Sequence, residues 1–205
     1  MASNKVAPTP RRGRPGYDQK AVLQIAVDVF NRHGYEATSM GILAENLGIS
    51  KSAIYHHVPS KEDLLRLALD EALGGLESVW RDPRAKDGSP SARLSYALRA
   101  TMRVLATRLP YVTLLLRLRG NTEMEQAALS RRRDFDHRLA DLVRAAQADG
   151  SVRQDVDPRL ISRLLFGSIN SIVEWYKPGG TLSVDELISN VYEIMARGIY
   201  AESAD

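Results

Sequence analysis

The sequence predicts an all-α protein of about nine helices, and three observations support this fold class. Apolar residues recur three and four positions apart through most of the 205 residues, whereas the alternation typical of half-buried strands is almost absent. Ser, Thr or Asp precedes many of these segments, often with an acidic residue three positions later, which is a helix-capping pattern. Gly and Pro fall between the periodic segments, where they would end each helix.

Residues 38–65 predict a helix-turn-helix unit. Thr38 and Ser39 provide a polar N-cap for a first helix with an apolar face at helical spacing. Gly48 would end this helix in the left-handed conformation, which only glycine adopts without steric cost. Ser50 can then cap a second helix, and in such a unit the second helix lies in the DNA major groove.

The second helix presents outward side chains that suit DNA. They are cationic, hydroxylic or aromatic, and none is acidic. These residues are Lys51, Ser52, Tyr55 and His56, with His57 at the helix end. Such side chains can bind phosphates and the edges of bases, so this face predicts a DNA-reading surface.

The same string resembles a known family of DNA-binding proteins. The matching residues are Thr38-Ser39, Leu43-Ala44, Leu47-Gly48-Ile49-Ser50, Lys51 to His57 and Pro59-Ser60-Lys61-Glu62-Asp63-Leu64-Leu65. On these residues the chain is similar to the TetR family of bacterial transcriptional regulators. The resemblance covers residues 17–66 and implies a DNA-binding domain there.

The resemblance also implies roles for individual residues in DNA binding. Contacts to the phosphate backbone are expected from Tyr55, His57 and Lys61. Contacts to bases or their phosphates are expected from Lys51, Ser52 and His56, and the predicted surface also includes Thr38 and Ser39. Many members carry a charged residue at position 41, where this chain has Gly41, so no phosphate contact is expected from that position.

Residues 1–16 form a basic segment without any acidic residue. Its charges are Lys5, Arg11, Arg12 and Arg14. One interpretation is a disordered, soluble tail. The other is a flexible arm whose three arginines enter the minor groove of A·T-rich DNA, which attracts inserted Arg side chains.

Composition restricts the function classes. The chain has no Cys, which excludes a disulfide framework, a thiolate metal site and a cysteine nucleophile. No apolar run approaches the ~18–20 residues that span a bilayer, and the N-terminus has no apolar signal region, so a cytoplasmic protein without a membrane partner is expected. The net charge of +3 is too modest to indicate nucleic acid by itself.

Helical periodicity and capping pairs continue through the rest of the chain. The sequence predicts helices over 18–32, 60–80, 91–109, 111–119, 122–150, 157–176 and 183–200, besides the two of the helix-turn-helix unit. Capping is expected from Asp18, Ser60, Thr122, Asp157 and Ser183. Residues 81–90, rich in charge, Pro and Gly, predict a mobile loop. The predicted organisation is an arm over 1–16, a helix-turn-helix domain over 17–66 and a ligand-binding and dimerisation domain over 67–205.

Residues 91–205 carry no recognisable catalytic pattern. His137 is the only His there and stands among charged residues, as expected of a solvated surface position. Asp134 and Asp136 are two positions apart and point to different helix faces, so they do not make a carboxylate pair. No enzyme activity, metal or cofactor is expected.

The last two helices are more apolar than one buried stripe requires. One interpretation is an ordinary intramolecular core. The other is a homodimer in which two helices of each subunit form a four-helix bundle. Its expected interface residues are Leu164, Gly167, Ser168, Ser171, Val191 and Met195. A dimer would place two recognition helices about one DNA turn apart and so match a palindromic operator.

A ligand pocket is expected between the fifth and eighth helices. Its candidate residues are Tyr96, Arg99, Met102, Arg103, Tyr111, Leu115, Phe135, Leu139, Phe166, Asn170 and Trp175. The alternative for each apolar member is plain core. A ligand with an apolar body and an anionic head would suit the mixture, because Arg binds phosphate or carboxylate bidentately.

Two shorter segments narrow the expected ligand. Residues 172–183 resemble a TetR subgroup that senses acyl-CoA thioesters, and residues 11–18 are similar to members linked to phenylacetate catabolism. The resemblance implies a dimeric repressor that binds a palindromic operator and is released by a small-molecule inducer such as an acyl-CoA thioester. The alternatives are a repressor of efflux or stress genes that responds to lipophilic compounds and, in another class, a helical small-molecule-binding protein or enzyme.

Overall fold

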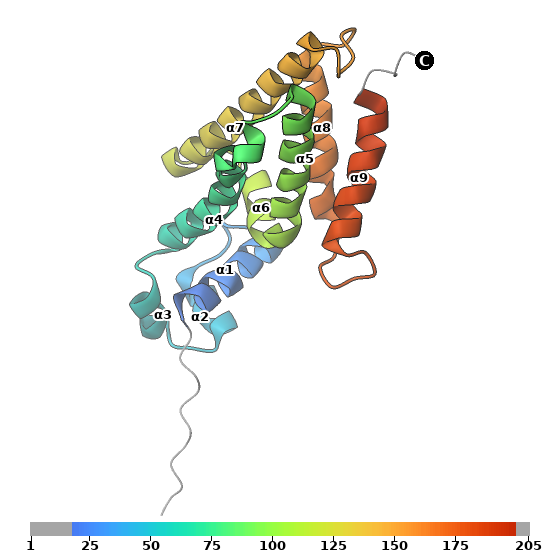
Figure 1. The fold of residues 1–205 in the computed structure, drawn as a ribbon. Helices are drawn as coiled ribbons and strands as arrows, with labels where there is room; N and C mark the ends of the chain where they lie inside the picture. Colours follow the sequence, from blue (N-terminus) through green and yellow to red (C-terminus); the bar gives the residue numbers. More distant parts are fainter. Residues whose placement is uncertain (1–17, 200–205) are drawn as a thin grey trace, which may run out of the picture.

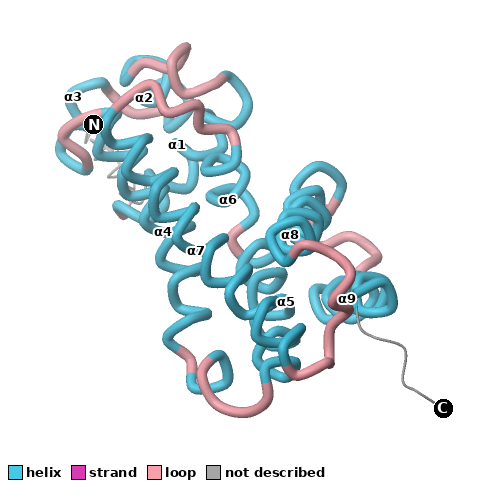
Figure 2. Tube along the Cα trace, turned by 90° about the horizontal axis from the view of Figure 1, so that it is seen from above, coloured by secondary structure: helices cyan, strands magenta, loops and turns pink. Residues whose placement is uncertain are grey.

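The computed structural model describes residues 18–199, and this part of the chain is helical throughout (Figure 1, Figure 2). The helices are α1 Gln19–His33, α2 Met40–Leu47, α3 Lys51–His57, α4 Lys61–Arg81, a short 3-10 helix Pro83–Ala85, α5 Pro90–Thr107, α6 Leu109–Leu116, α7 Glu123–Ala148, α8 Pro158–Trp175 and α9 Val184–Ile199. The predicted all-α fold is therefore confirmed.

Polar caps start the helices where the sequence predicts them. The Ser60 hydroxyl accepts the backbone N–H of Asp63 at 3.0 Å and donates to the Asp63 carboxylate at 2.7 Å. The same kind of backbone bond is made by Asp18, Thr122, Asp157 and Ser183. Each bond satisfies a backbone donor that has no partner inside its own helix, so these residues fix where the helices begin.

Two predicted boundaries differ from the structure. The segment 81–90, predicted as a mobile loop, contains the 3-10 helix, in which Asp82 accepts from the backbone and guanidinium of Arg84 and Ala85 is buried. α6 begins at Leu109 rather than at residue 111. Pro110 fits this first turn, because a helix start leaves its own N–H groups unbonded and proline has none to lose.

The helix α4 runs through both parts of one continuous hydrophobic core. Its first turn contributes Leu64 and Leu65 to the core formed with α1, α2 and α3, and its last turns pack against α5, α6 and α7 (Figure 1). The boundary expected between residues 66 and 67 falls inside this unbroken helix. The end of the molecule that holds α2 and α3 is therefore connected to the rest by a continuous rod and not by a flexible linker.

In the larger part, α5 is the central helix. It packs against α4, α7, α8 and α9, and its buried face includes Leu94, Leu98, Met102 and Leu105. Figure 2 shows α5 enclosed by its neighbours, with α9 on the side away from α4.

The helix α4 approaches α5 closely at Gly75. A Cβ at this position would lie 2.8 Å from a methyl of Val104 and 3.1 Å from the side chain of Arg108. A β-branched residue such as Val104 cannot easily turn aside. The adjacent Gly74 has open space around the same point, so the two glycines differ in packing although they share one helix turn.

We therefore expect Gly75→Ala to lower the free energy of unfolding by about 1–3 kcal/mol through overpacking, despite the better helix propensity of Ala. Gly74→Ala is the matched control and should raise that free energy by up to about 1 kcal/mol. Urea unfolding of both variants measures the difference. Equal free energies of unfolding for the two variants would show that α4 can move away from α5 at no cost in stability.

Candidate functional site

The helix-turn-helix unit has the geometry that its sequence predicts. Ser39 caps α2, with its hydroxyl accepting the N–H of Ile42 at 3.2 Å, and Gly48 ends the helix at φ 65° and ψ 32°. Ser50 caps α3 through the N–H of Ala53 at 3.1 Å. Leu47 and Ile54 are buried against α1 and α4, so the two helices are held at a fixed angle.

The outer face of α3 is exposed at one end of the molecule, away from α7, α8 and α9 (Figure 1). Lys51, Ser52, Tyr55 and His56 are exposed there, and His57 is half-buried. Tyr55 exposes 47% of its surface, which is unusual for an aromatic residue on a helix packed at its other face. The face offers a cation, hydroxyls and imidazoles without an acidic group, as phosphates and base edges require.

Among the described residues of the predicted DNA-binding surface, Thr38 alone faces inward. It is buried, and its hydroxyl donates to the carbonyl of Gly34 at 2.8 Å. The expectation that its side chain lies on the DNA-facing surface is therefore wrong. Only Ser39 of the expected capping pair caps α2, and it stays exposed.

Lys61 makes two contacts that the sequence does not reveal. Its ammonium donates to the carbonyl of Tyr35 at 3.0 Å and lies 4.2 Å from the centroid of the Tyr35 ring. Burial, with smaller contributions from Glu62 and Glu36, raises the pKa of Tyr35 to about 12, so its hydroxyl stays protonated near neutral pH. Lys61 thus ties the start of α4 to the loop that leads into α2.

The predicted arm residues Arg11, Arg12 and Arg14 lie outside the described residues.

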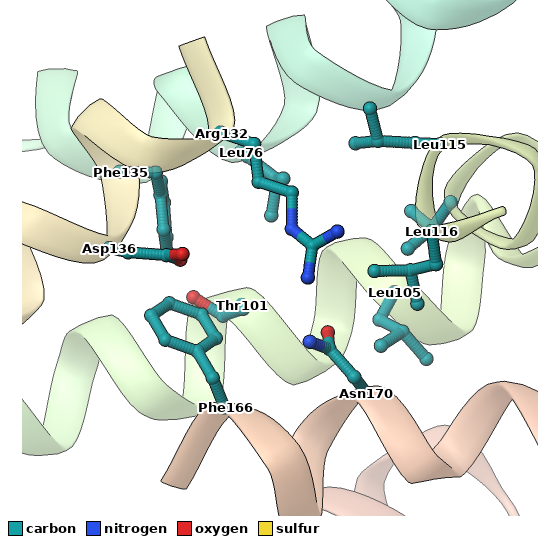
Figure 3. Close-up of a pocket in the computed structure, with 11 residues that line it drawn as sticks. Leu76, Thr101, Leu105, Leu115, Leu116, Arg132, Phe135, Asp136, Phe166 and Asn170 are labelled. Atoms are coloured by element: carbon teal, nitrogen blue, oxygen red, sulfur yellow. The ribbon is translucent and has the colours of Figure 1, made fainter. Parts of the chain in front are cut away.

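A small enclosed cavity of about 20 Å³ lies within the larger part, between α4 and α8 (Figure 3). Four of the predicted pocket residues line it, namely Leu115, Phe135, Phe166 and Asn170. The sequence reasoning missed Leu76, Thr101, Leu105, Val112, Leu116, Arg132 and Asp136, which complete the lining. An arginine and an aspartate four residues apart, on the side of α7 that also carries Phe135 and Leu139, were the available signal.

The other predicted pocket residues do not line this cavity. Met102 and Leu139 are buried elsewhere in the core, and Tyr111 donates to the side-chain oxygen of Gln24 at 3.1 Å. Trp175 is half exposed at the end of α8. Helical spacing shows which residues lie on the same apolar side of a helix. It does not show which of them line a cavity and which pack in the core.

Arg99, Arg103 and Tyr96 are likewise engaged away from the cavity. The Arg99 guanidinium lies 3.8 Å from the ring centroid of Tyr192, and Arg103 pairs with Asp185 at 2.5 Å. Both contacts join α5 to α9. Tyr96 stacks under Arg84 of the 3-10 helix at 4.5 Å. These three residues hold helices and loops together rather than facing a ligand.

Three polar side chains, Arg132, Asp136 and Asn170, lie together with Phe166 at one end of the cavity. Arg132 and Asp136 are one turn apart on α7, and Phe166 and Asn170 are one turn apart on α8 (Figure 3). Burial raises the pKa of Asp136, and the charges of Arg132 and His137 oppose that rise. The same four residues also line a larger groove, so they separate the cavity from it.

The groove is open and basic. It has a volume of about 670 Å³, and Arg133, His137, Arg159 and Arg163 line it beside the shared residues. Asp136 is its acidic residue. An apolar cavity next to a wide arginine-lined groove can accommodate a ligand with an apolar end and an anionic end.

An apolar strip runs along the outer side of α8 and α9. Leu160, Leu164, Trp175 and Ile194 are exposed there, Leu164 to 62% and Ile194 to 76%. Four of the predicted interface residues are also exposed, namely Leu164, Gly167, Ser168 and Ser171, while Val191 and Met195 are half-buried. A contiguous exposed apolar patch is a feature typical of surfaces that bind another protein, a membrane or a ligand.

Within residues 18–199, no cluster of His, Asp and Glu is arranged to hold a metal ion. None of the helices in this range combines the length and the apolar character needed to cross a membrane.

Comparison with known proteins identifies the family. The chain matches the model for bacterial regulatory proteins of the TetR family over residues 22–68 and that for the tetracycline repressor-like C-terminal domain over residues 87–199. The repressor KstR2 of Mycolicibacterium smegmatis is 27% identical over 195 residues, which cover 94% of this chain and 95% of the relative.

Solved structures agree with this match. The TetR-family protein SCO3833 of Streptomyces coelicolor A3 is 47% identical, with a TM-score of 0.82 over 94% of this chain and 92% of that one. AibR, solved with isovaleryl coenzyme A and operator DNA, is 24% identical with a TM-score of 0.71 over 86% and 96% of the chains, which shows a common fold. The C-terminal match alone spans more than half of the sequence, and the chain therefore belongs to the TetR family of bacterial transcriptional regulators.

Proposed function

We propose that this protein is a homodimeric repressor that binds a palindromic operator through α3 and is released by an acyl-CoA thioester. The observation that carries the ligand class is the apolar cavity that adjoins an arginine-lined groove. Such a protein acts on chromosomal DNA in the bacterial cytoplasm and catalyses no reaction. The whole-length similarity to KstR2 repressors supports repression over activation.

The apolar strip on α8 and α9 supports the dimer. In a dimer with two-fold symmetry the same strip of each subunit packs against its copy, which buries Leu164 and Ile194. Gly167, Ser168 and Ser171 are small and exposed, so the helices of two subunits could approach closely. The symmetry would then present two copies of α3 to the two halves of an operator.

The cavity and groove divide the ligand into two parts. The acyl group would enter between Leu105, Leu115 and Phe135, and the CoA phosphates would lie in the groove near Arg133, Arg159 and Arg163. The apolar lining by itself would also suit an uncharged lipophile. The arginines favour the thioester, because they would gain charge-assisted hydrogen bonds only from an anionic ligand.

The helix α6 connects the cavity with the DNA-binding end. Leu115 and Leu116 line the cavity. On the other side of α6, Asn31 of α1 donates to the carbonyl of Pro110 at 2.8 Å, and Arg117 donates to the carbonyl of Asn31 at 2.7 Å. A ligand that displaces α6 would therefore shift α1 and the recognition helix packed on it.

The DNA contacts are tested with two lysines at equivalent helix positions, the first residues of α3 and α4. Lys51→Met and Lys61→Met should each lower the slope of log affinity against log salt by about one unit, as expected for one lost phosphate contact. Lys61→Met should also lower the free energy of unfolding by about 1–3 kcal/mol, because it removes a charged hydrogen bond to Tyr35.

Lys86→Met is the control, since Lys86 is exposed in the segment between α4 and α5, far from α3. It should leave both the salt slope and the stability unchanged. Tyr55→Ala completes the series and should weaken operator binding. If Tyr55→Ala and both lysine variants fold and bind the operator as the wild type does, the recognition surface is assigned to the wrong face.

The dimer is tested at Leu164. Leu164→Glu would bury a carboxylate at the centre of the proposed interface, so the variant should sediment as a monomer and lose cooperative operator binding. Ala127→Glu, at an exposed position of α7, should remain dimeric. A dimer of wild-type strength in the Leu164→Glu protein would place the interface elsewhere.

The inducer is tested by titrating the operator complex with phenylacetyl-CoA, a long-chain acyl-CoA, free CoA and the free acids. A thioester should dissociate the complex, and the free acid should do so much less well because it has no phosphates for the groove arginines to hold. Arg163→Ala should weaken the thioester response. Dissociation by uncharged hydrophobic compounds alone, with no effect of any thioester at submillimolar concentration, would instead indicate a sensor of lipophiles.

A further inference from the structure

Arg132 occupies an unusual position for a charged side chain. Its guanidinium projects from α7 into the centre of the cavity, toward Asn170 (Figure 3). Four leucines, Leu76, Leu105, Leu115 and Leu116, belong to the surrounding wall. Within residues 18–199 the guanidinium forms no hydrogen bond or ion pair, although Asp136 feels its charge.

An arginine in this position lacks the partners that a cation requires. Arg132 is half-buried, so its guanidinium loses part of its hydration without gaining a hydrogen bond, and the leucine walls offer only contact with its methylene stem. Arg132 also borders the groove, where Arg133, Arg159 and Arg163 outnumber the one carboxylate, Asp136. Without an anion there, repulsion from these three arginines opposes movement of Arg132 further into the groove.

The remaining cavity is too small for an acyl group. A volume of about 20 Å³ exceeds only slightly the roughly 10–15 Å³ that a single water needs. Space for a ligand must therefore come from a side chain that leaves, and Arg132 is the longest side chain in the lining.

We propose that Arg132 is a charge-operated plug of the acyl cavity, which swings into the groove when ligand phosphates arrive there and so admits the acyl group only of an anionic ligand. This inference rests on the proposed ligand site. Phosphates in the groove cancel the repulsion and offer Arg132 the hydrogen bonds that it lacks in the cavity. The same movement vacates the space that the acyl group then fills.

Two substitutions at position 132 separate the effect of the space that the side chain fills from the effect of its charge. Arg132→Ala removes both the bulk and the charge, so the cavity becomes accessible to uncharged ligands. Arg132→Met keeps an unbranched apolar stem in the cavity but removes the charge that phosphates attract. Arg133→Ala is the matched control, because Arg133 lines the groove but not the cavity.

The probes are phenylacetyl-CoA and its N-acetylcysteamine thioester, which carries the same acyl group without phosphates. Binding is followed by the fluorescence of Trp80 in a Trp175→Phe background, since the Trp80 ring lies 5.1 Å from that of Phe135 in the cavity wall. Arg132→Ala should bind the uncharged thioester about tenfold more tightly than the wild type, the equivalent of about 1.4 kcal/mol. Arg132→Met and Arg133→Ala should show no such gain and should bind the CoA thioester more weakly.

A gain for the uncharged probe in Arg132→Ala cannot arise from a merely damaged fold, which would only reduce binding. Equal binding of the uncharged probe by folded Arg132→Ala and wild type would overturn the plug, as would the same gain in Arg132→Met. Toluene serves as a probe that involves no thioester. If no thioester binds the wild type but toluene binds Arg132→Ala about tenfold more tightly, the proposed inducer is wrong and the plug stands.

Discussion

The buried side of α4 is the constraint on which the other parts depend. One continuous stripe from Leu64 to Val79 contributes to the core around the recognition helix at one end and to the cavity wall, through Leu76, at the other. Arg131 of α7 pairs with Asp70 at 2.8 Å and with Glu77 at 2.7 Å, both in α4. These ion pairs hold α7 against α4 beside the buried stripe. Because α4 is a single helix, a change at its cavity end must move the DNA-binding end or bend the rod.

Charge is distributed unevenly over the described surface. The recognition face has no acidic residue on α3, and the groove between α7 and α8 gathers arginines around one aspartate. Between these surfaces, arginines are paired with carboxylates or backbone carbonyls, as Arg108 is with Glu71. Exposed pairs of this kind contribute little to stability, so their main effect is to hold helices in register. Within residues 18–199, the arginines that line the groove and cavity have no such partner.

Local features of the sequence predicted most of the fold. A capping residue or a periodic apolar position can be recognised from a few neighbouring residues in the sequence. The helix starts at Asp18, Ser60 and Asp157 were predicted from such local patterns. The recognition surface was equally local, apart from Thr38, whose hydroxyl turns back to Gly34. The cavity lining was predictable only in part, with four residues expected and seven missed, because the wall combines five helices. An apolar residue on a helix looks the same in the sequence whether a neighbour or a void lies opposite.

The energetics of release require both halves of the ligand site. Moving a two-state equilibrium from mostly bound to mostly released takes a difference in affinity of about 10⁴-fold, or about 5.5 kcal/mol. At about 0.8 kcal/mol for each buried methylene, roughly seven such groups would have to contact the released state alone. A small cavity beside Phe135 cannot supply that contact for a short acyl group. In the proposed mechanism the rest must come from contacts in the groove that are stronger in the released arrangement than in the DNA-bound one.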